Sequence, residues 1–218
     1  MPAHPLPTGA IEIDAAAVRL AGDCRVPAGA SGLVLFAHGS GSGRLSPRNR
    51  QVAEALNAAG LGTLLFDLLT DAEAADRRNV FDVDLLAERL QAAKDWVVGQ
   101  PALAGLGIGY FGASTGAAAA LIAAADDPDG VSAVVSRGGR PDLAADRLPA
   151  VRTPTLLIVG GADTEVLRLN QAARERLRGP SELAVIPGAT HLFEEPGALE
   201  AVAELSAAWF TEHLGGAA

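Results

Sequence analysis

Cysteine, lysine and aromatic residues are scarce in this sequence of 218 residues. Cys24 and Lys94 are the only residues of their types, and aromatic residues make up 4% of the chain. A single cysteine excludes a disulfide within the chain, and a reducing compartment is then the simpler expectation. Because aromatic rings are few, the core must be built from the alanine, valine, leucine and isoleucine that dominate the 49% of hydrophobic residues.

Clusters of basic residues and long apolar runs are also absent. The formal net charge is −9 and the arginines are scattered, so no surface is expected to follow a nucleic acid backbone. No stretch approaches 18 uninterrupted apolar residues, and the first ten residues lack the pattern of a signal peptide. We expect a cytoplasmic protein that binds neither nucleic acid nor a membrane. The bias toward alanine, glycine, proline and arginine suggests a bacterial source.

What the sequence does contain is a series of short apolar runs. Residues 10–14 and 17–22 alternate apolar and polar side chains, which predicts an antiparallel pair of strands with one wet face. The runs that follow are nearly continuous and end in glycine or polar residues, as strands buried on both faces of a parallel sheet do. These runs cover residues 32–39, 60–67, 103–112, 131–139, 153–161 and 182–188.

Helical patterns fill the gaps between these runs. Ser46 as N-cap, Pro47 at the first helical position and Gly60 as the stop delimit one helix. Others are expected around Leu86, Leu90, Ala93 and Val97 and over residues 115–125, 165–179 and 197–215. The order predicts an α/β fold with about eight mostly parallel strands and helices on both faces. We expect one domain, residues 10–214, after a flexible tail, residues 1–9.

The stretch Gly112-Ala113-Ser114-Thr115-Gly116 matches the pattern G-x-S-x-G. The match alone is weak because the chain has 25 glycines, so its surroundings decide. A predicted strand precedes it and an alanine-rich helix follows, which is the context of a nucleophile elbow. Gly112 and Gly116 leave room for the sharp turn, and the helix N-terminus favours negative charge beside Ser114. These features predict a catalytic Ser114.

A serine nucleophile needs a base, and the chain offers four histidines. His4 lies in a proline-rich tail, His213 in the last turn of the final helix, and His38 at the end of a predicted strand. His191 follows the last strand in a loop, where this architecture delivers its base. We therefore expect His191 to be the base, against the alternative of a solvent-facing loop histidine.

The base in turn needs an orienting acid. Asp163 follows the seventh predicted strand, and the chain order Ser, Asp, His is the order of α/β-hydrolases. The alternative reading of Asp163 is an N-cap for the helix that begins near Glu165. Asp67, after the fourth strand, is a weaker rival for the same role.

An oxyanion hole would complete the apparatus. We expect one backbone N–H from Thr115 and one from the loop after the third strand, with Ser40 favoured over its glycine neighbours. That loop lacks a P-loop lysine, and no G-x-G-x-x-G opens a helix, so no nucleotide cofactor is predicted. No second histidine stands at a ligand spacing from His191, so no metal site is predicted either.

Four segments in this order resemble an α/β-hydrolase of the dienelactone-hydrolase-like type: residues 32–43, 109–116, 156–163 and 188–197. The resemblance covers nearly the whole chain. It implies a triad of Ser114, Asp163 and His191 and acyl-enzyme chemistry on an ester. Dienelactone hydrolases typically carry cysteine in the elbow, whereas serine stands here, which shifts the expectation toward a general carboxylesterase or lactonase.

Substrate clues are few. Only residues 136–154 separate the sixth and seventh strands, too few for a substantial lid, so we expect an open, shallow site for small acyl groups. Arg137 and Arg140 lie at the carboxyl edge of the sheet, where either could bind a substrate carboxylate. The alternative is a structural role, by contact with loop carbonyls or with Asp142 or Asp146.

The sequence thus favours a serine hydrolase that acts on small esters or lactones. A second hypothesis is a binding or auxiliary protein associated with a partner enzyme, because some proteins it resembles occur beside phosphoribosyltransferase-like domains. A third keeps the triad but transfers the acyl group to another acceptor, as acyltransferases and perhydrolases do. The sequence makes no prediction of the oligomeric state.

Overall fold

The computed structural model describes residues 8–215 and contains one sheet of eight strands in the order β1-β2-β4-β3-β5-β6-β7-β8. β1 pairs antiparallel with β2, β2 pairs antiparallel with β4, and the remaining pairs are parallel. The predicted mostly parallel sheet is therefore confirmed. Its strands are β1 (Gly9–Ala15), β2 (Val18–Arg25), β3 (Gly32–Ala37), β4 (Gly62–Phe66), β5 (Gly107–Ala113), β6 (Ala133–Arg137), β7 (Thr155–Gly160) and β8 (Ser181–Ile186).

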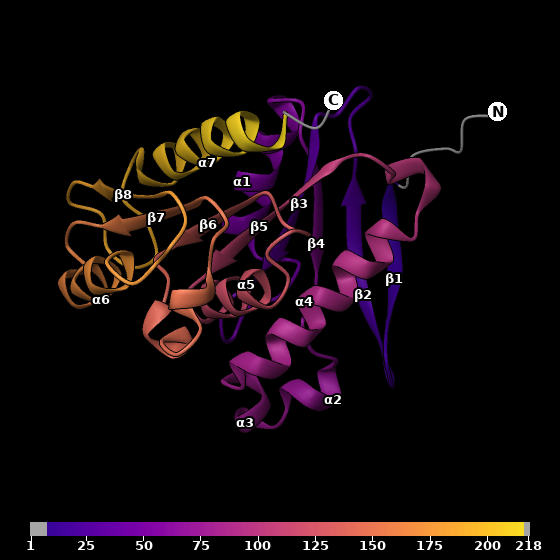
Figure 1. Cartoon of the computed structure of the whole chain (residues 1–218), viewed down its shortest axis with the longest axis horizontal. Coiled ribbons are helices and arrows are strands. Elements are labelled where there is room, and N and C mark those ends of the chain that lie inside the picture. The colour runs from indigo at the N-terminus through magenta and orange to yellow at the C-terminus, as the bar shows by residue number, and fades with distance from the viewer. Residues whose placement is uncertain (1–7, 216–218) are drawn as a thin grey trace.

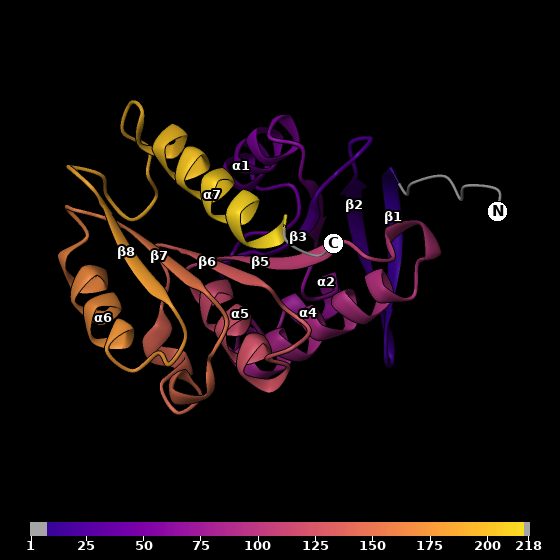
Figure 2. The same cartoon turned by 45° about the horizontal axis from the view of Figure 1, so that its top comes forward.

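Helices cover both faces of the sheet, as Figure 1 and the turned view of Figure 2 show. α1 (Pro47–Ala58) and α7 (Ala198–Leu214) lie together on one face. α4 (Val83–Val98), α5 (Thr115–Asp126) and α6 (Thr164–Arg174) lie on the other. The other helices of the described residues are short: α2 (Asp71–Ala74), α3 (Arg77–Val80), η1 (Pro101–Leu103), η2 (Pro141–Ala144) and η3 (Leu148–Ala150). No helix within residues 8–215 has the length and apolar character to cross a membrane.

The continuous apolar runs are explained by burial on both sheet faces. In β3, Leu33 and Leu35 belong to the core beneath α4 and α5, whereas Val34 and Phe36 belong to the core beneath α1 and α7. All four side chains are at most 1% exposed. Successive side chains of a strand point to opposite faces, so a strand covered on both sides must be apolar at every position.

Local sequence signals place the helices where they were expected. The Ser46 side chain accepts a hydrogen bond from the Asn49 N–H at the start of α1, and Pro47 occupies the first helical position. The short helices α2 and α3 were not predicted. β1 begins at Gly9, one residue before the expected start of the domain, and residues 1–7 of the predicted tail, with His4, lie outside the described residues.

Between residues 136 and 154 the chain forms only η2, η3 and turns, so no cap domain covers the sheet edge at this point. The absence of a substantial cap within residues 8–215 agrees with the expectation from the length of this segment. Two short helices, α2 and α3, instead form a compact segment between β4 and α4.

Gly116 allows α5 to approach β3 closely. A Cβ atom on Gly116 would lie 2.2 Å from the carbonyl oxygen of Ala37 and 2.5 Å from that of His38. Both obstacles are backbone atoms, which cannot move without separating the helix from the strand. We therefore expect Gly116→Ala to lower the free energy of unfolding by about 3 kcal/mol or more, with a fall in Tm of roughly 10 °C, as measured by thermal unfolding.

Gly99 provides the matched control for this substitution. It has right-handed helical backbone angles, and a Cβ on it would meet nothing closer than 3.4 Å. Gly99→Ala is therefore expected to change stability by less than about 1 kcal/mol. Equal Tm values for the two variants would contradict the close approach of α5 to β3.

Candidate active site

The predicted catalytic residues follow three different strands of the sheet. Ser114 follows β5, Asp163 follows β7, and His191 lies in the loop after β8. The loop after β3 carries Gly39 and Ser40 to the same edge. These four strands run parallel, so their carboxyl ends meet at one edge, where open α/β sheets bind ligands.

Ser114 occupies a strained turn between β5 and α5. Its backbone angles are φ 52° and ψ −117°, in the region that residues other than glycine rarely adopt. The Ser114 N–H donates a hydrogen bond to the carbonyl oxygen of Arg137 at 3.2 Å, which ties the turn to β6. Gly39 packs against the serine, because a Cβ on it would lie 3.1 Å from the Ser114 Cβ. The turn thus has the shape of a nucleophile elbow.

Asp163 and His191 contact each other across the strand ends. The His191 Nδ1 lies 2.7 Å from the Asp163 Oδ2, at hydrogen-bond distance. Asp163 does occupy the N-cap position of α6, but its side chain makes no capping hydrogen bond. The carboxylate is therefore directed to the histidine and not to the helix, and the catalytic role of Asp163 stays a prediction.

Ser114 and His191 line one cavity of about 210 Å³. Arg48, Arg137 and Leu192 contribute to its walls, as do Gly39, Ser40, Ser42, Ser46 and Ala113. Within residues 8–215, the Ser114 hydroxyl makes no hydrogen bond to His191. Catalytic hydrogen bonds of this kind are often long until substrate is bound.

The predicted oxyanion donors lie beside the elbow, and they are coupled to each other. The Ser40 N–H donates a hydrogen bond to the Thr115 Oγ1 at 2.9 Å, so the threonine hydroxyl already occupies this donor. The Thr115 N–H belongs to the first turn of α5, whose N–H groups have no acceptor inside the helix. The sequence analysis considered only the backbone of Thr115 and did not predict the hydrogen bond that its hydroxyl accepts from the Ser40 N–H.

The other candidates have different contacts. The Asp67 carboxylate accepts hydrogen bonds from the Arg44 N–H at 2.7 Å and from its Nη1 at 2.5 Å, and it makes none to a histidine. His213 packs edge-on against Trp209, with ring centroids 4.3 Å apart. Neither residue lines the cavity with Ser114.

His38 holds the loop after β3 to the loop after β4. Its Nε2 accepts a hydrogen bond from the Leu68 N–H at 3.0 Å, and its Nδ1 lies 3.1 Å from the Gly39 carbonyl oxygen. A neutral ring with the proton on Nδ1 satisfies both contacts. Burial lowers the pKa of His38 below the usual 6.5 and outweighs the Gly39 carbonyl and Asp67 carboxylate, which favour the charged ring.

This lowered pKa makes stability depend on pH. Below pH 6.5 the unfolded chain protonates His38 while the folded chain keeps it neutral, so acid favours the unfolded state. We expect the free energy of unfolding to fall as the pH drops below 6.5, with His38 contributing at most about 1.4 kcal/mol per pH unit. Urea unfolding of the wild type and of His38→Gln over this range measures that contribution as the difference in slope. Equal slopes would contradict it.

The two predicted substrate arginines differ in their surroundings. Arg140 donates from its Nε and Nη2 to the two Asp142 oxygens, at 2.8 and 2.7 Å, and does not line the cavity with Ser114. Arg137 lines that cavity, is 8% exposed, and lies with its guanidinium carbon 5.9 Å from the centre of the Phe193 ring. The structure therefore gives Arg140 the structural contact considered as its alternative and leaves Arg137 at the site.

A second cavity, of about 400 Å³, also involves Gly39, Ser40 and Ser42. Asp71, Ala74 and Val80 of the α2–α3 segment also line this cavity.

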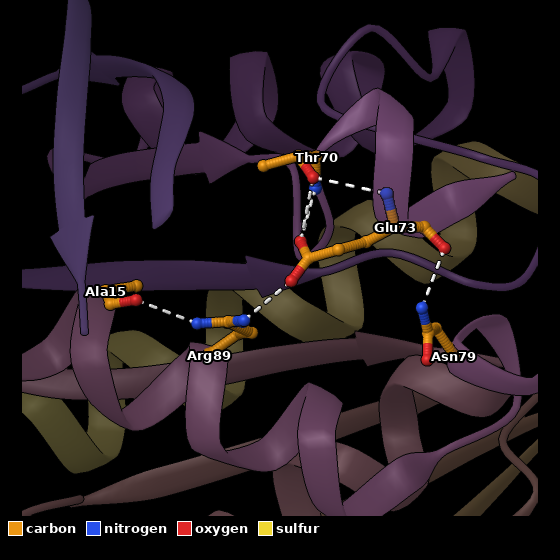
Figure 3. A network of polar contacts seen from close by, with 5 residues as sticks. All are labelled: Ala15, Thr70, Glu73, Asn79 and Arg89. Carbon is orange, nitrogen blue, oxygen red and sulfur yellow. Dashed lines mark hydrogen bonds and ion pairs between the residues drawn. The ribbon is translucent and has the colours of Figure 1, made fainter. Parts of the chain in front are cut away.

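A polar network fixes the α2–α3 segment, as Figure 3 shows. In it, Arg89 donates to Glu73 Oε1 and to the Ala15 carbonyl oxygen, both at 2.8 Å; Thr70 and Glu73 form a capping box, and Asn79 donates to the Glu73 carbonyl oxygen. The α2–α3 segment is a wall beside the site that the sequence did not predict.

Fold and site together define a hydrolase-type α/β protein. The family described as alpha/beta hydrolase domain matches residues 30–208, and the chain belongs to this family. A solved structure, a dienelactone hydrolase from Anabaena variabilis, is 56% identical, with a TM-score of 0.92 over 94% of this chain and 97% of that one. The resemblance to the dienelactone-hydrolase-like type is thereby confirmed.

Two further relatives mark the limits of this likeness. Est1E from Butyrivibrio proteoclasticus has a TM-score of 0.81 over 94% of this chain and 99% of its own, but at 18% identity it shows only the fold. A Mycobacterium tuberculosis protein with the name "Putative phosphoribosyl transferase" is 58% identical over 97% of this chain and 48% of its own length. The chain thus spans about half the length of this relative.

Proposed function

We propose that the chain is a serine hydrolase that cleaves small carboxylic esters or lactones through an acyl-enzyme on Ser114. The observation that carries the proposal is the 2.7 Å contact between Asp163 and His191 at the rim of the cavity that contains Ser114. A partly buried carboxylate at hydrogen-bond distance from Nδ1 fixes the imidazole so that Nε2 is the free basic nitrogen. The hydrolase fold and the solved dienelactone hydrolase at 56% identity support the same class of reaction.

Each residue then has a defined step. His191 Nε2 takes the proton of the Ser114 hydroxyl as Oγ attacks the carbonyl carbon, and returns it to the departing alcohol. Water repeats the sequence on the acyl-enzyme, releases the acid and restores the serine. The Thr115 N–H receives the oxyanion, while the second donor, the Ser40 N–H, is shared with the Thr115 hydroxyl or released from it.

The size and openness of the site favour small substrates. The cavity at Ser114 has a volume of about 210 Å³, and no cap domain adds an apolar tunnel above it within residues 8–215. Saturable hydrolysis is therefore expected for acetyl and butyryl esters and for small lactones, with little turnover of long-chain esters. A chain-length series with product analysis in the presence of a competing alcohol tests this. Predominant transfer to the alcohol would favour an acyltransferase, and binding without turnover would favour an auxiliary protein.

The transferase name of the mycobacterial relative concerns a protein twice as long as the matched region. We assign phosphoribosyl transfer to the part of that relative which this chain does not match, because the matched part has the hydrolase fold. This chain alone is then expected to give no product in a phosphoribosyl transfer assay. Because this chain matches only about half of that relative, a second candidate is a hydrolase that works in association with a partner enzyme.

A further inference from the structure

The second cavity adjoins the cavity at Ser114 and is the larger of the two. Gly39, Ser40 and Ser42 line both, and the volumes are about 400 Å³ and about 210 Å³. Ser40 supplies one of the proposed oxyanion donors, so the second cavity begins at the backbone that would hold the carbonyl oxygen of the substrate. The reaction proposed above uses only the cavity at Ser114, and the space beside it has no role in that reaction.

Much of the lining of the second cavity is apolar. Leu69 and Leu86 are 8% and 3% exposed, Val80 packs against the core cluster to which they belong, and the exposed Leu45 also lines the cavity. Pockets that bind small molecules are typically apolar with a few polar groups. A dry cavity of about 150 Å³ is enough to bind benzene. The second cavity therefore has room for an aromatic ring or a branched alkyl group.

The charged groups of this cavity do not suit an anion. Among the described residues that line it, Arg44 is the one arginine, and the Asp67 carboxylate accepts hydrogen bonds from its N–H and from its Nη1. Both ring nitrogens of His38 contact backbone groups. Asp71, in the first turn of α2, adds a negative charge. The cavity thus favours an uncharged group.

The wall that α2 and α3 contribute is held in place before any ligand binds. Arg89 of α4 joins Glu73 of α2 to the carbonyl oxygen of Ala15 at the end of β1 (Figure 3). Asn79 of α3 donates a hydrogen bond to the Glu73 carbonyl oxygen, which ties the two short helices together. A wall that is already ordered loses little conformational entropy when a ligand binds against it.

The place of His191 indicates which end of an ester enters the second cavity. His191 lines the cavity at Ser114 and does not line the second one. In the proposed reaction it returns a proton to the departing alcohol, so the alcohol oxygen must lie beside His191. The carbonyl oxygen faces the N–H groups of Ser40 and Thr115. The acyl group, the remaining substituent of the carbonyl carbon, is then the part that extends past Ser40.

We propose that the second cavity binds the acyl group of the substrate, and that this group is uncharged and carries an aromatic ring or a branched alkyl chain. The inference rests on the proposed ester hydrolase and names its substrate class. Ala74 of α2 and Val80 of α3 line the cavity and limit the size of the group that fits.

Three esters that differ in the position of one phenyl ring test the proposal. Ethyl acetate has no ring, ethyl phenylacetate carries it on the acyl side, and the isomeric 2-phenylethyl acetate carries it on the alcohol side. For the wild type, kcat/KM is expected to be at least about tenfold higher for ethyl phenylacetate than for ethyl acetate, with a smaller gain for the isomer. Equal values for the first two esters, or a larger gain for the isomer, would overturn the proposal and leave the ester hydrolase standing.

Ala74→Trp places a large side chain at the lining of the cavity. The preference for ethyl phenylacetate over ethyl acetate is expected to fall by at least about tenfold in this variant. Ala75→Trp is the matched control, because Ala75 is the next residue, is also exposed and does not line the cavity, so the preference should persist. Val80→Trp blocks the cavity from α3 and replaces Ala74→Trp should that variant not fold. A wild-type preference in a folded Ala74→Trp or Val80→Trp protein would contradict the assignment.

A binding measurement separates failure of this inference from failure of the hydrolase. Phenylacetamide is an uncharged analogue of the acyl part, and its titration into the full chain, followed by NMR, needs no turnover. Binding that weakens at least about tenfold in Ala74→Trp but not in Ala75→Trp, in a protein that hydrolyses no ester, would support the cavity as a binding site and overturn the proposed function. No binding of phenylacetamide, together with no preference for ethyl phenylacetate, would overturn the inference alone.

Discussion

Replacement of Ser114 by alanine is expected to lower kcat/KM for a short-chain ester by at least about 10⁴-fold. The loss is large because the acyl-enzyme cannot form without Oγ, and His191 and Asp163 act only through the nucleophile. Stability should change little, since alanine and serine have similar strain at the backbone angle φ 52° of this position. Steady-state kinetics and thermal unfolding of the same preparation measure both quantities.

Ser132→Ala is the matched control for this variant. Ser132 is exposed and lies just before β6, at the opposite edge of the sheet from the cavity. The control should keep the wild-type kcat/KM and the wild-type Tm. Wild-type turnover by a folded Ser114→Ala protein would contradict the assignment of the nucleophile.

Asparagine in place of Asp163 is expected to lower kcat by about 10⁴-fold while the fold remains intact. The amide keeps the shape of the carboxylate but cannot stabilise the imidazolium or fix the proton on His191 Nδ1. Because Asp163 makes no capping hydrogen bond to α6, the substitution removes little helix stability. Rate measurements at saturating substrate, with circular dichroism as a check of folding, give the result.

Asp67→Asn is the corresponding variant of the rival acid. Asp67 contacts Arg44 at the second cavity. We therefore expect Asp67→Asn to lower kcat far less than Asp163→Asn does. An Asp67→Asn protein that loses the greater part of its activity while Asp163→Asn remains active would reverse the assignment of the acid. A double variant would then show whether the two carboxylates act together.

The sequence predicted the strands and long helices because their signals are local. Apolar runs bounded by glycine mark the strands, and the Ser46, Pro47 and Gly60 pattern marks α1. α2 and α3 were missed because each has four residues, none of them buried, so neither forms a hydrophobic period. The Thr70 and Glu73 capping box was the one local signal for α2.

The site was predictable to the extent that topology determines it. Chain order and parallel strands bring Ser114, Asp163 and His191 to one edge of the sheet without any knowledge of their side-chain contacts. The hydrogen bond from Ser40 to the Thr115 hydroxyl joins residues 75 positions apart, and no local pattern encodes it.

The measurement that tests the central claim most directly is the intact mass of the protein after reaction with a fluorophosphonate probe, followed by peptide mapping. Such probes react with serines that an adjacent base has activated. We predict one adduct per chain, located on Ser114 and absent from Ser114→Ala and from His191→Ala. A folded wild-type protein that remains unlabelled, or that is labelled at another residue, would contradict the account of Ser114 as a nucleophile activated by His191.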